Sequence, residues 1–157
     1  GLPDATALAD GWNVTFQPNR GAPASVRLDR LMDLSRHAED GIRHFSGTAT
    51  YRNSFQSKTQ NPRSKIYLDL GEVRNLVEVI VNGRHLGVLW KKPFRLDITD
   101  ALQVGANELE VRVTNLWVNR LIGDADKMAA LGVDSITTDR PDLAVRARAE
   151  GEGTKEP

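Results

Sequence analysis

Short runs in which apolar and polar residues alternate occupy much of the first three quarters of this chain. The clearest of them cover the stretches 12–16, 48–55, 65–70, 94–98 and 108–113. A period of two is typical of a strand that buries one face. We also expect a short strand over 25–28, a strand or turn over 31–34 and a polar loop over 41–47. Because no long amphipathic helix separates these runs, the pattern predicts an all-β fold, an antiparallel β-sandwich, rather than β-α-β units.

The strongest turn signal is Asn82-Gly83, which joins two apolar runs. Two adjacent residues that tolerate positive φ are what a tight two-residue hairpin turn requires, so we predict a β-hairpin centred here. Further on, Thr99 and Asp100 suit a cap for one helical turn that ends near Leu102. The residues 105–107 then read as a turn before the next strand.

Composition excludes some classes of function without choosing one. The chain has 157 residues, with 21 basic residues against 21 acidic ones and no formal net charge at pH 7. This balance gives no general attraction to nucleic acid or to an anionic membrane, and we expect neither as a partner. No apolar run approaches the roughly 18 residues of a membrane span. The absence of cysteine excludes disulfides and thiolate metal sites.

The character of the chain changes after Asp124. Residues 124–131 are compatible with two helical turns that Gly132 would end, and the stretch from Thr137 onward is charged and poor in large apolar groups. We therefore expect a β-sandwich domain over 1–124, followed over 125–157 by a short helical turn and a disordered tail. Because the first residue is Gly1 rather than methionine, we also expect a piece of a longer or processed polypeptide.

One stretch has the residue types of a sugar-binding surface. A pyranose ring has one apolar face and a belt of hydroxyl groups, so it is bound by an aromatic ring beside planar hydrogen-bonding side chains. Trp117 lies within a few residues of Asn115, Asn119 and Arg120, directly after a predicted strand. The alternative is that Trp117 caps the sandwich core while Arg120 pairs with a nearby carboxylate.

A second candidate is Trp90 with Lys91, at the end of the predicted hairpin and before Pro93. Its alternative interpretation is a core tryptophan, and for Trp12 the alternation favours the core outright. The three histidines are not at metal-ligand spacing, and His85 is expected to be exposed on the hairpin. We expect no metal site among them.

Catalysis by this chain alone is not expected. A (β/α)₈ glycosidase barrel needs roughly 250 residues. Glycoside hydrolysis also needs two carboxylates placed across a sugar site, one of them with a raised pKa. Four acidic residues of the predicted strands fall on outward, solvated faces, namely Asp69, Glu78, Glu108 and Glu110.

The stretch from Leu70 to Gly87, which contains the Asn82-Gly83 turn, resembles the sugar-binding jelly-roll domain of family 2 glycoside hydrolases. The segments Phe94-Arg-Leu-Asp-Ile-Thr99 and 105–115 continue the resemblance in the same order. The segments Phe45-Ser-Gly-Thr-Ala-Thr-Tyr-Arg52 and 115–124 are most similar to the C-terminal sandwich domain of large bacterial α-L-rhamnosidases. The resemblance covers about residues 12–124. It departs at Lys92, where the group more often has proline, and after Asp124, where the chain does not look like the usual continuation.

The resemblance implies a galactose-binding-like jelly roll that is non-catalytic and belongs to a multidomain glycoside hydrolase. Carbohydrate and the catalytic barrel domain would be its partners, and Asn115, Asn119 and Arg120 would be lent to the barrel's active site. It favours a periplasmic or secreted location. It implies no cofactor, although sandwiches of this type often carry a structural Ca²⁺, for which the sequence identifies no ligands. A self-standing carbohydrate-binding module or lectin and a purely structural interaction domain remain the alternatives.

Overall fold

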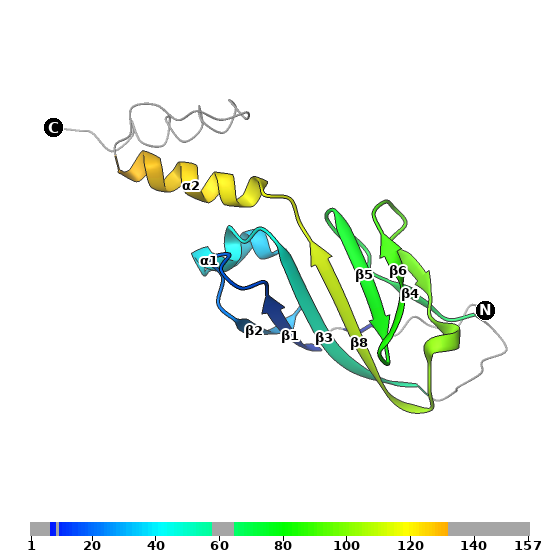
Figure 1. Ribbon diagram of the computed structural model, residues 1–157. Helices are drawn as coiled ribbons and strands as arrows, with labels where there is room; N and C mark the ends of the chain where they lie inside the picture. Colours follow the sequence, from blue (N-terminus) through cyan, green and yellow to red (C-terminus); the bar gives the residue numbers. More distant parts are fainter. Residues whose placement is uncertain (1–6, 9, 58–64, 132–157) are drawn as a thin grey trace.

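The computed structural model describes residues 7–8, 10–57 and 65–131, and eight strands make up most of this part (Figure 1). The strands are β1 Asp10–Phe16, β2 Ser25–Arg30, β3 Thr48–Ser57, β4 Tyr67–Asp69, β5 Leu76–Val81, β6 Arg84–Leu89, β7 Arg95–Asp97 and β8 Gly105–Thr114. The helical elements are two single 3₁₀ turns, η1 Leu34–Arg36 and η2 Thr99–Ala101, a short helix α1 Asp40–Arg43, and the longer α2 Val118–Ala130. The prediction of an all-β antiparallel sandwich is confirmed.

Six strands form one antiparallel sheet in the order β2-β1-β3-β8-β5-β6. Burial alternates along the strands of this sheet. In β5 the side chains of Val77, Val79 and Val81 are buried, whereas those between them are only partly so. Because the period is two, the register of each strand is fixed by which face meets the core.

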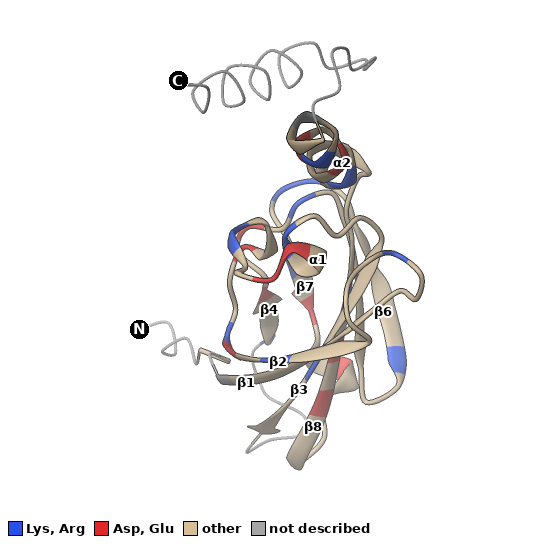
Figure 2. Ribbon diagram, turned by 90° about the vertical axis from the view of Figure 1, so that its left-hand side faces the viewer, with Lys and Arg blue, Asp and Glu red and all other residues tan. Residues whose placement is uncertain are grey.

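The second layer is the small antiparallel pair β4 and β7, which lies across from the large sheet (Figure 2). Its central pair, Leu68 and Leu96, packs against the core that the large sheet supplies. The buried core consists of apolar side chains from the large sheet and from the connections between strands: Trp12, Val14, Phe16, Leu28, Ile42, Phe45, Ala49, Val77, Val79, Val81, Phe94, Ile98, Leu102, Leu109 and Val111. Trp12 is therefore the core residue that we expected.

The predicted hairpin is present as β5–β6. Asn82 and Gly83 have φ angles of 51° and 76°, so both central residues of the turn adopt the left-handed conformation. The Asn82 side chain also makes hydrogen bonds to residues outside the hairpin. Its Nδ2 donates to the Ala101 carbonyl and to Asn107 Oδ1, both at 2.8 Å. The turn is thus tied to η2 and to the start of β8.

Several local expectations were wrong. The stretch 41–47 is not simply a polar loop, because α1 and the residues after it place Ile42 and Phe45 in the core. The Phe45 ring lies 4.9 Å from the Phe16 ring, centroid to centroid, in an edge-to-face arrangement. The stretch 31–34 is not a strand; it leads into the 3₁₀ turn η1, whose first residue is Leu34 and whose first hydrogen bond is accepted by the Asp33 carbonyl.

The residues 105–107 belong to β8 rather than to a turn. Asn107 is fully buried there because its amide group is hydrogen-bonded on both sides. The helical turn at 99–101 exists, but Ile98 occupies its cap position and makes no side-chain hydrogen bond. Thr99 instead donates its N–H and its hydroxyl to the Asp97 carboxylate, at 3.0 and 2.6 Å.

Helix α2 begins at Val118, six residues before the start that we expected. It leaves the sheet at the end of β8 and extends beyond the sandwich (Figure 1). The candidate residues Asn119 and Arg120 are therefore helical, and the expected boundary at 124 falls inside α2. The expected tail from Thr137 onward lies outside the described residues.

Candidate functional site at one end of the large sheet

The register brings the two candidate clusters to the same end of the large sheet. Leu76 of β5 pairs with Thr114 at the end of β8, and Val77 pairs with Leu89 at the end of β6. Since β6 and β8 both flank β5, their ends are separated by two strand spacings, or about 10 Å. The chain after each strand leaves the sheet at this end, as Figure 1 shows. We call this region the tryptophan end, because Trp90 follows β6 and Trp117 follows β8.

Both tryptophans project into solvent. Trp90 is 69% exposed and Trp117 is 65% exposed, and Leu116 beside Trp117 is also exposed. The alternative interpretations that placed Trp90 in the core and made Trp117 a cap over it are therefore wrong. The Lys91 ammonium lies 5.3 Å from the centre of the Trp90 ring, so it takes part in a cation–π contact. Within the part of the chain that the structure describes, these are the tryptophans whose rings are available to another molecule.

Asn115 has a structural role at this end. Its Oδ1 accepts from the Gly47 N–H at 2.8 Å, and its Nδ2 donates to the Phe45 carbonyl at 2.8 Å. The Asn115 N–H also donates to the Gly47 carbonyl at 3.2 Å. The side chain thus fixes the chain after α1 against the end of β8. With both amide groups engaged, Asn115 has little capacity left for a ligand.

Arg120 is held in place by the beginning of α2 and by the chain after α1. Its Nε lies 3.1 and 3.2 Å from the two Asp124 oxygens, one turn further along the helix, so the alternative interpretation, in which Arg120 pairs with a carboxylate, agrees with the structure. Its backbone N–H donates to Ser46 Oγ at 3.0 Å. Asn119 is half-buried, and its side chain makes no hydrogen bond within the described residues. Of the polar candidates on this segment, Asn119 and the rest of the Arg120 guanidinium can still bind a partner.

Helix α2 contacts the sandwich through a close approach at Gly123. A Cβ added to Gly123 would lie 2.6 Å from Cγ of the His44 ring, so only glycine fits against that ring. His44 Nε2 is 3.9 Å from a carboxylate oxygen of Asp126. A small cavity of about 130 Å³ lies beside this contact, with Arg120 in its wall. The helix therefore has a defined position at its N-terminal half.

The carboxylates on the strands do not form a hydrolytic pair. Glu110 is partly buried, which by itself raises the pKa of its carboxyl group. Hydrogen bonds from Arg112 and Arg52 outweigh that effect and hold the pKa below its usual value. Hydrogen bonds from the Thr99 hydroxyl, and after it from Lys65, lower the pKa of Asp97 to about 2. Glycoside hydrolysis requires a carboxylic acid whose pKa is raised, so neither group is suited to that role.

The described residues also provide no metal-binding cluster. They contain no group of three or more histidine, aspartate or glutamate side chains arranged around a common point. None of the helices in the described part has both the length and the apolar character to span a bilayer.

Comparison with known protein families now identifies this architecture. The model of the glycosyl hydrolase 2 galactose-binding domain-like family matches residues 30–147. The chain belongs to this family. The match continues beyond Asp124, so our expectation that the chain departs from the family at that point was wrong. The jelly-roll domain of family 2-type glycoside hydrolases that the sequence resembles is the domain that the structure contains.

Individual relatives come from more than one kind of glycosidase. A protein of Formosa agariphila, provisionally named a β-glucuronidase, is 47% identical over 125 residues, which are 78% of this chain and 11% of that protein. A rhamnosidase structure from Novosphingobium sp. PP1Y is 47% identical, with a TM-score of 0.75 over 77% of this chain and 12% of the other. The β-glucuronidase of Ruminococcus gnavus shares the fold, with 20% identity and a TM-score of 0.59 over 70% of this chain and 21% of that one. The chain spans about a tenth of the length of the first two relatives.

Sequence reasoning missed two features of this end. Leu116 was not selected, although it lies just past the alternating run, where an apolar side chain is no longer directed into the core. The His44–Gly123 contact was also missed, because nothing in the local sequence pairs residues so far apart. The i, i+4 spacing of Arg120 and Asp124 was a readable signal for their ion pair.

Proposed function

We propose that this chain is a non-catalytic domain of a multidomain glycoside hydrolase, and that its tryptophan end packs against the catalytic domain. Three large apolar side chains carry the proposal. Trp90, Leu116 and Trp117 are all exposed at one end of a sandwich whose other large aromatic side chains are mostly buried. An exposed apolar cluster with polar neighbours is typical of a surface that another protein surface covers.

The length of the relatives supports the same proposal. A domain that makes up about a tenth of its relatives has the remainder of such a polypeptide as a ready partner. Asn119 and Arg120 lie at the start of α2, beside Trp117, and are our proposed polar contacts at this boundary. There they would border the active site of the catalytic domain. Asn115 is excluded from that group by its internal hydrogen bonds.

Within the glycoside hydrolases we propose an α-L-rhamnosidase as the parent enzyme. The 47% identity to the rhamnosidase from Novosphingobium supports this choice. The relative from Formosa agariphila with the same identity makes a β-glucuronide the second substrate to test. An aryl α-L-rhamnoside and an aryl β-D-glucuronide, offered to the complete enzyme, separate these two classes.

The packing proposal is tested by Trp117→Ala and Trp90→Ala, with Val104→Ala as the control. Val104 is 63% exposed but precedes β8, at the opposite end of the sheet. In the isolated chain all three variants should unfold at the wild-type temperature, because each removes a solvent-exposed side chain. In calorimetry of the complete polypeptide, this domain and the catalytic domain should unfold in separate transitions only in the two tryptophan variants. Equal effects of Trp117→Ala and Val104→Ala in the complete polypeptide would contradict the proposal.

A self-standing carbohydrate-binding module is favoured by one observation, the accessibility of the two tryptophan rings. Calorimetry or a glycan array with the isolated chain tests it. Strong binding that Trp117→Ala removes would replace the packing proposal with this one. Hydrolysis of either aryl glycoside by the isolated chain would show that the chemistry does not reside in another domain.

A further inference from the structure

We propose that the opposite end of the sandwich holds a binding site for a neutral monosaccharide or terminal sugar residue. A cavity of about 270 Å³ lies between the hairpin and the segment formed by β7 and η2. Ligand pockets begin at roughly this size, about 300 Å³, so the space suits a single sugar ring rather than a long chain. That the ligand is a sugar rests on the proposed function. The location of the site rests on the cavity itself.

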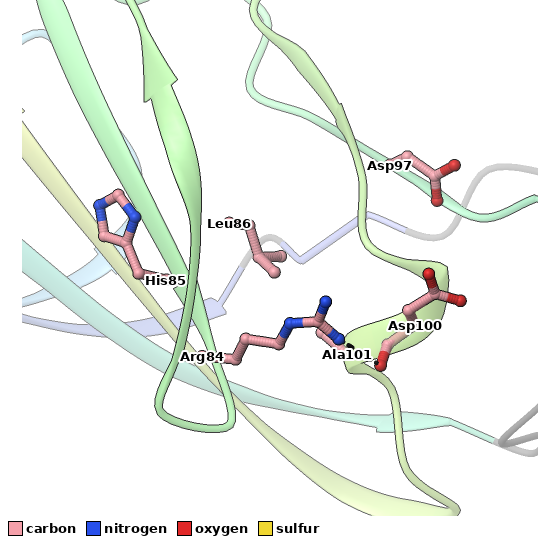
Figure 3. A pocket seen from close by; sticks show the side chains of 6 residues that line it. All are labelled: Arg84, His85, Leu86, Asp97, Asp100 and Ala101. Atoms are coloured by element: carbon pink, nitrogen blue, oxygen red, sulfur yellow. Dashed lines mark hydrogen bonds between the residues drawn. The ribbon is translucent and has the colours of Figure 1, made fainter.

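The side chains around the cavity combine a donor, an acceptor and an apolar floor. Arg84 and Leu86 extend from β6 toward the segment that carries Asp97 and Asp100, while the His85 ring lies on the other side of β6 (Figure 3). Leu86 is half-buried and can meet the apolar face of a sugar ring, as can Ala101 from η2. A few convergent polar groups beside a small apolar surface are the usual chemistry of a small-ligand pocket.

The polar groups around the cavity differ in how many hydrogen bonds they can still make to a ligand. Asp97 accepts hydrogen bonds from Thr99 and an ion pair from Lys65 at 2.9 Å, so its capacity is largely used. Asp100 accepts no side-chain hydrogen bond from the described residues. The Arg84 guanidinium uses Nη1 on the Asp100 carbonyl, at 3.1 Å, and its other donors remain. An acceptor carboxylate and a guanidinium with spare donors can together bind adjacent sugar hydroxyls.

The charges around the cavity decide the kind of sugar. The positive charges of Arg84 and Lys65 equal the two carboxylates of Asp97 and Asp100, and Lys65 is paired with Asp97. Because these charges balance, a uronate gains no net attraction here, while its carboxylate must still lose water. The site therefore favours an uncharged sugar.

The walls of the cavity are held in place before any ligand arrives. The Asn82 amide donates to the Ala101 carbonyl at 2.8 Å, and Arg84 donates to the neighbouring Asp100 carbonyl. These bonds join the hairpin to η2 across the cavity. A preorganised site loses little conformational entropy on binding, although the lack of an aromatic ring keeps the affinity in the millimolar range.

Chemical-shift titration of the full 157-residue chain with methyl α-L-rhamnoside, methyl β-D-galactoside and sodium D-glucuronate tests the proposal. We expect at least one neutral glycoside to shift the signals of Arg84, Leu86 and Asp100, and glucuronate to leave them unchanged. Asp100→Asn and Arg84→Met should each weaken this binding by about tenfold, the effect of one good hydrogen bond. Arg95→Met, which removes an exposed arginine from the face of Tyr67, is the matched control and should bind as the wild type does.

Three results would overturn the proposal: no shift at these residues with either neutral glycoside, shifts confined to Trp90 and Trp117, or equal binding of glucuronate. A thermal melt of each variant shows whether it is folded. If Arg84→Met does not fold, Asp100→Asn still tests the proposal. The test is independent of the packing experiment, which perturbs only the tryptophan end. Failure at the cavity and failure at the tryptophan end are therefore distinguishable.

Discussion

A single substitution at the buried amide of Asn107 should remove a large part of the stability of this domain. Asn107 Nδ2 donates to the carbonyls of Gln103 and Gly105, at 2.9 and 3.0 Å. Its Oδ1 accepts from the Gln103 N–H and from Asn82 Nδ2, both at 2.8 Å. Asn107→Ala removes all of these bonds at once. It also removes one of the bonds that join the hairpin turn to the beginning of β8, while the two bonds between Asn82 and the Glu108 backbone remain.

The magnitude follows from the number of bonds and their exposure. Each intramolecular hydrogen bond contributes about 0.5–1.5 kcal/mol net, so the four bonds together correspond to about 2–6 kcal/mol. Gln103 is exposed, so water can replace part of what its backbone loses, and we expect about 2–4 kcal/mol. Against a total stability of about 5–15 kcal/mol this is a large fraction. The melting temperature should fall by roughly 10 °C in a domain of this size.

Urea titration followed by circular dichroism measures the loss directly, and Glu108→Ala is the control. Glu108 is the next residue of β8, is exposed, and keeps its backbone bond to Asn82 Oδ1 when its side chain is shortened. Asn107→Asp should also destabilise strongly at neutral pH. A carboxylate oxygen, which can only accept, would then replace Nδ2 and face the carbonyl oxygens of Gln103 and Gly105. A loss for Asn107→Ala below about 1 kcal/mol, or equal to that of Glu108→Ala, would refute the argument that this amide network holds the two segments together.

Three further outcomes follow from the structure. Gly83→Val should destabilise by about 1–3 kcal/mol in a thermal melt, because a β-branched residue resists the φ of 76° there, and an unchanged melt would contradict the hairpin assignment. Hydrogen bonding to Thr99 lowers the pKa of Asp97 from 3.8 to about 2, so its contribution is complete above pH 3.8 and is lost as the pH falls toward 2. Between these pH values the free energy of unfolding of the wild type, measured by urea titration, should therefore fall more steeply than that of Asp97→Asn. The same pH dependence in both proteins would contradict a stabilising role for this carboxylate. Gly123→Ala should destabilise, although alanine normally favours a helix, because its Cβ would meet the His44 ring at 2.6 Å. In a His44→Ala background the same change should become neutral or stabilising, and calorimetry showing the same loss in both backgrounds would rule out this contact.

The strands and the hairpin could be read from the sequence because one physical rule governs both. A strand that buries one face must alternate, and the run from Glu108 to Val113 does so, with the buried Leu109 and Val111 on its inner face. Asn82-Gly83 adds the backbone requirement of a tight turn. These signals are local, so no knowledge of the rest of the fold is needed to interpret them.

The two tryptophans of the candidate site were selected from the sequence, but their exposure could not be predicted from the alternation of the strands. Trp90 and Trp117 lie just outside their strands, so the alternation no longer determines which way a side chain points. Their size alone favoured the core. The pairing of β6 and β8 with β5 decides that both emerge at one end, and that pairing depends on residues far apart in the chain.

Buried residues in polar stretches were hidden from the sequence by a different cause. Ile42 lies in the short helix α1 and Phe45 two residues beyond its end, so no apolar repeat stands out against their polar neighbours. Asn107 can be buried because its side-chain hydrogen bonds are made within the fold. In the sequence alone, an Asn two residues after Gly105 is a turn signal. In both cases the tertiary surroundings override the local preference.

The two ends of the sandwich are suited to different tasks because the strands keep them apart. The ten residues of β8 span about 30 Å, with Trp117 beyond one end and the Arg84–Asp100 cavity beside the other. A catalytic domain that covers the tryptophan end would therefore leave the cavity open to solvent. If both proposals hold, the domain would present a sugar residue at a fixed distance from the catalytic domain. A complete enzyme whose cavity is covered by the catalytic domain, as judged by loss of glycoside binding on going from the isolated chain to the full polypeptide, would exclude that arrangement.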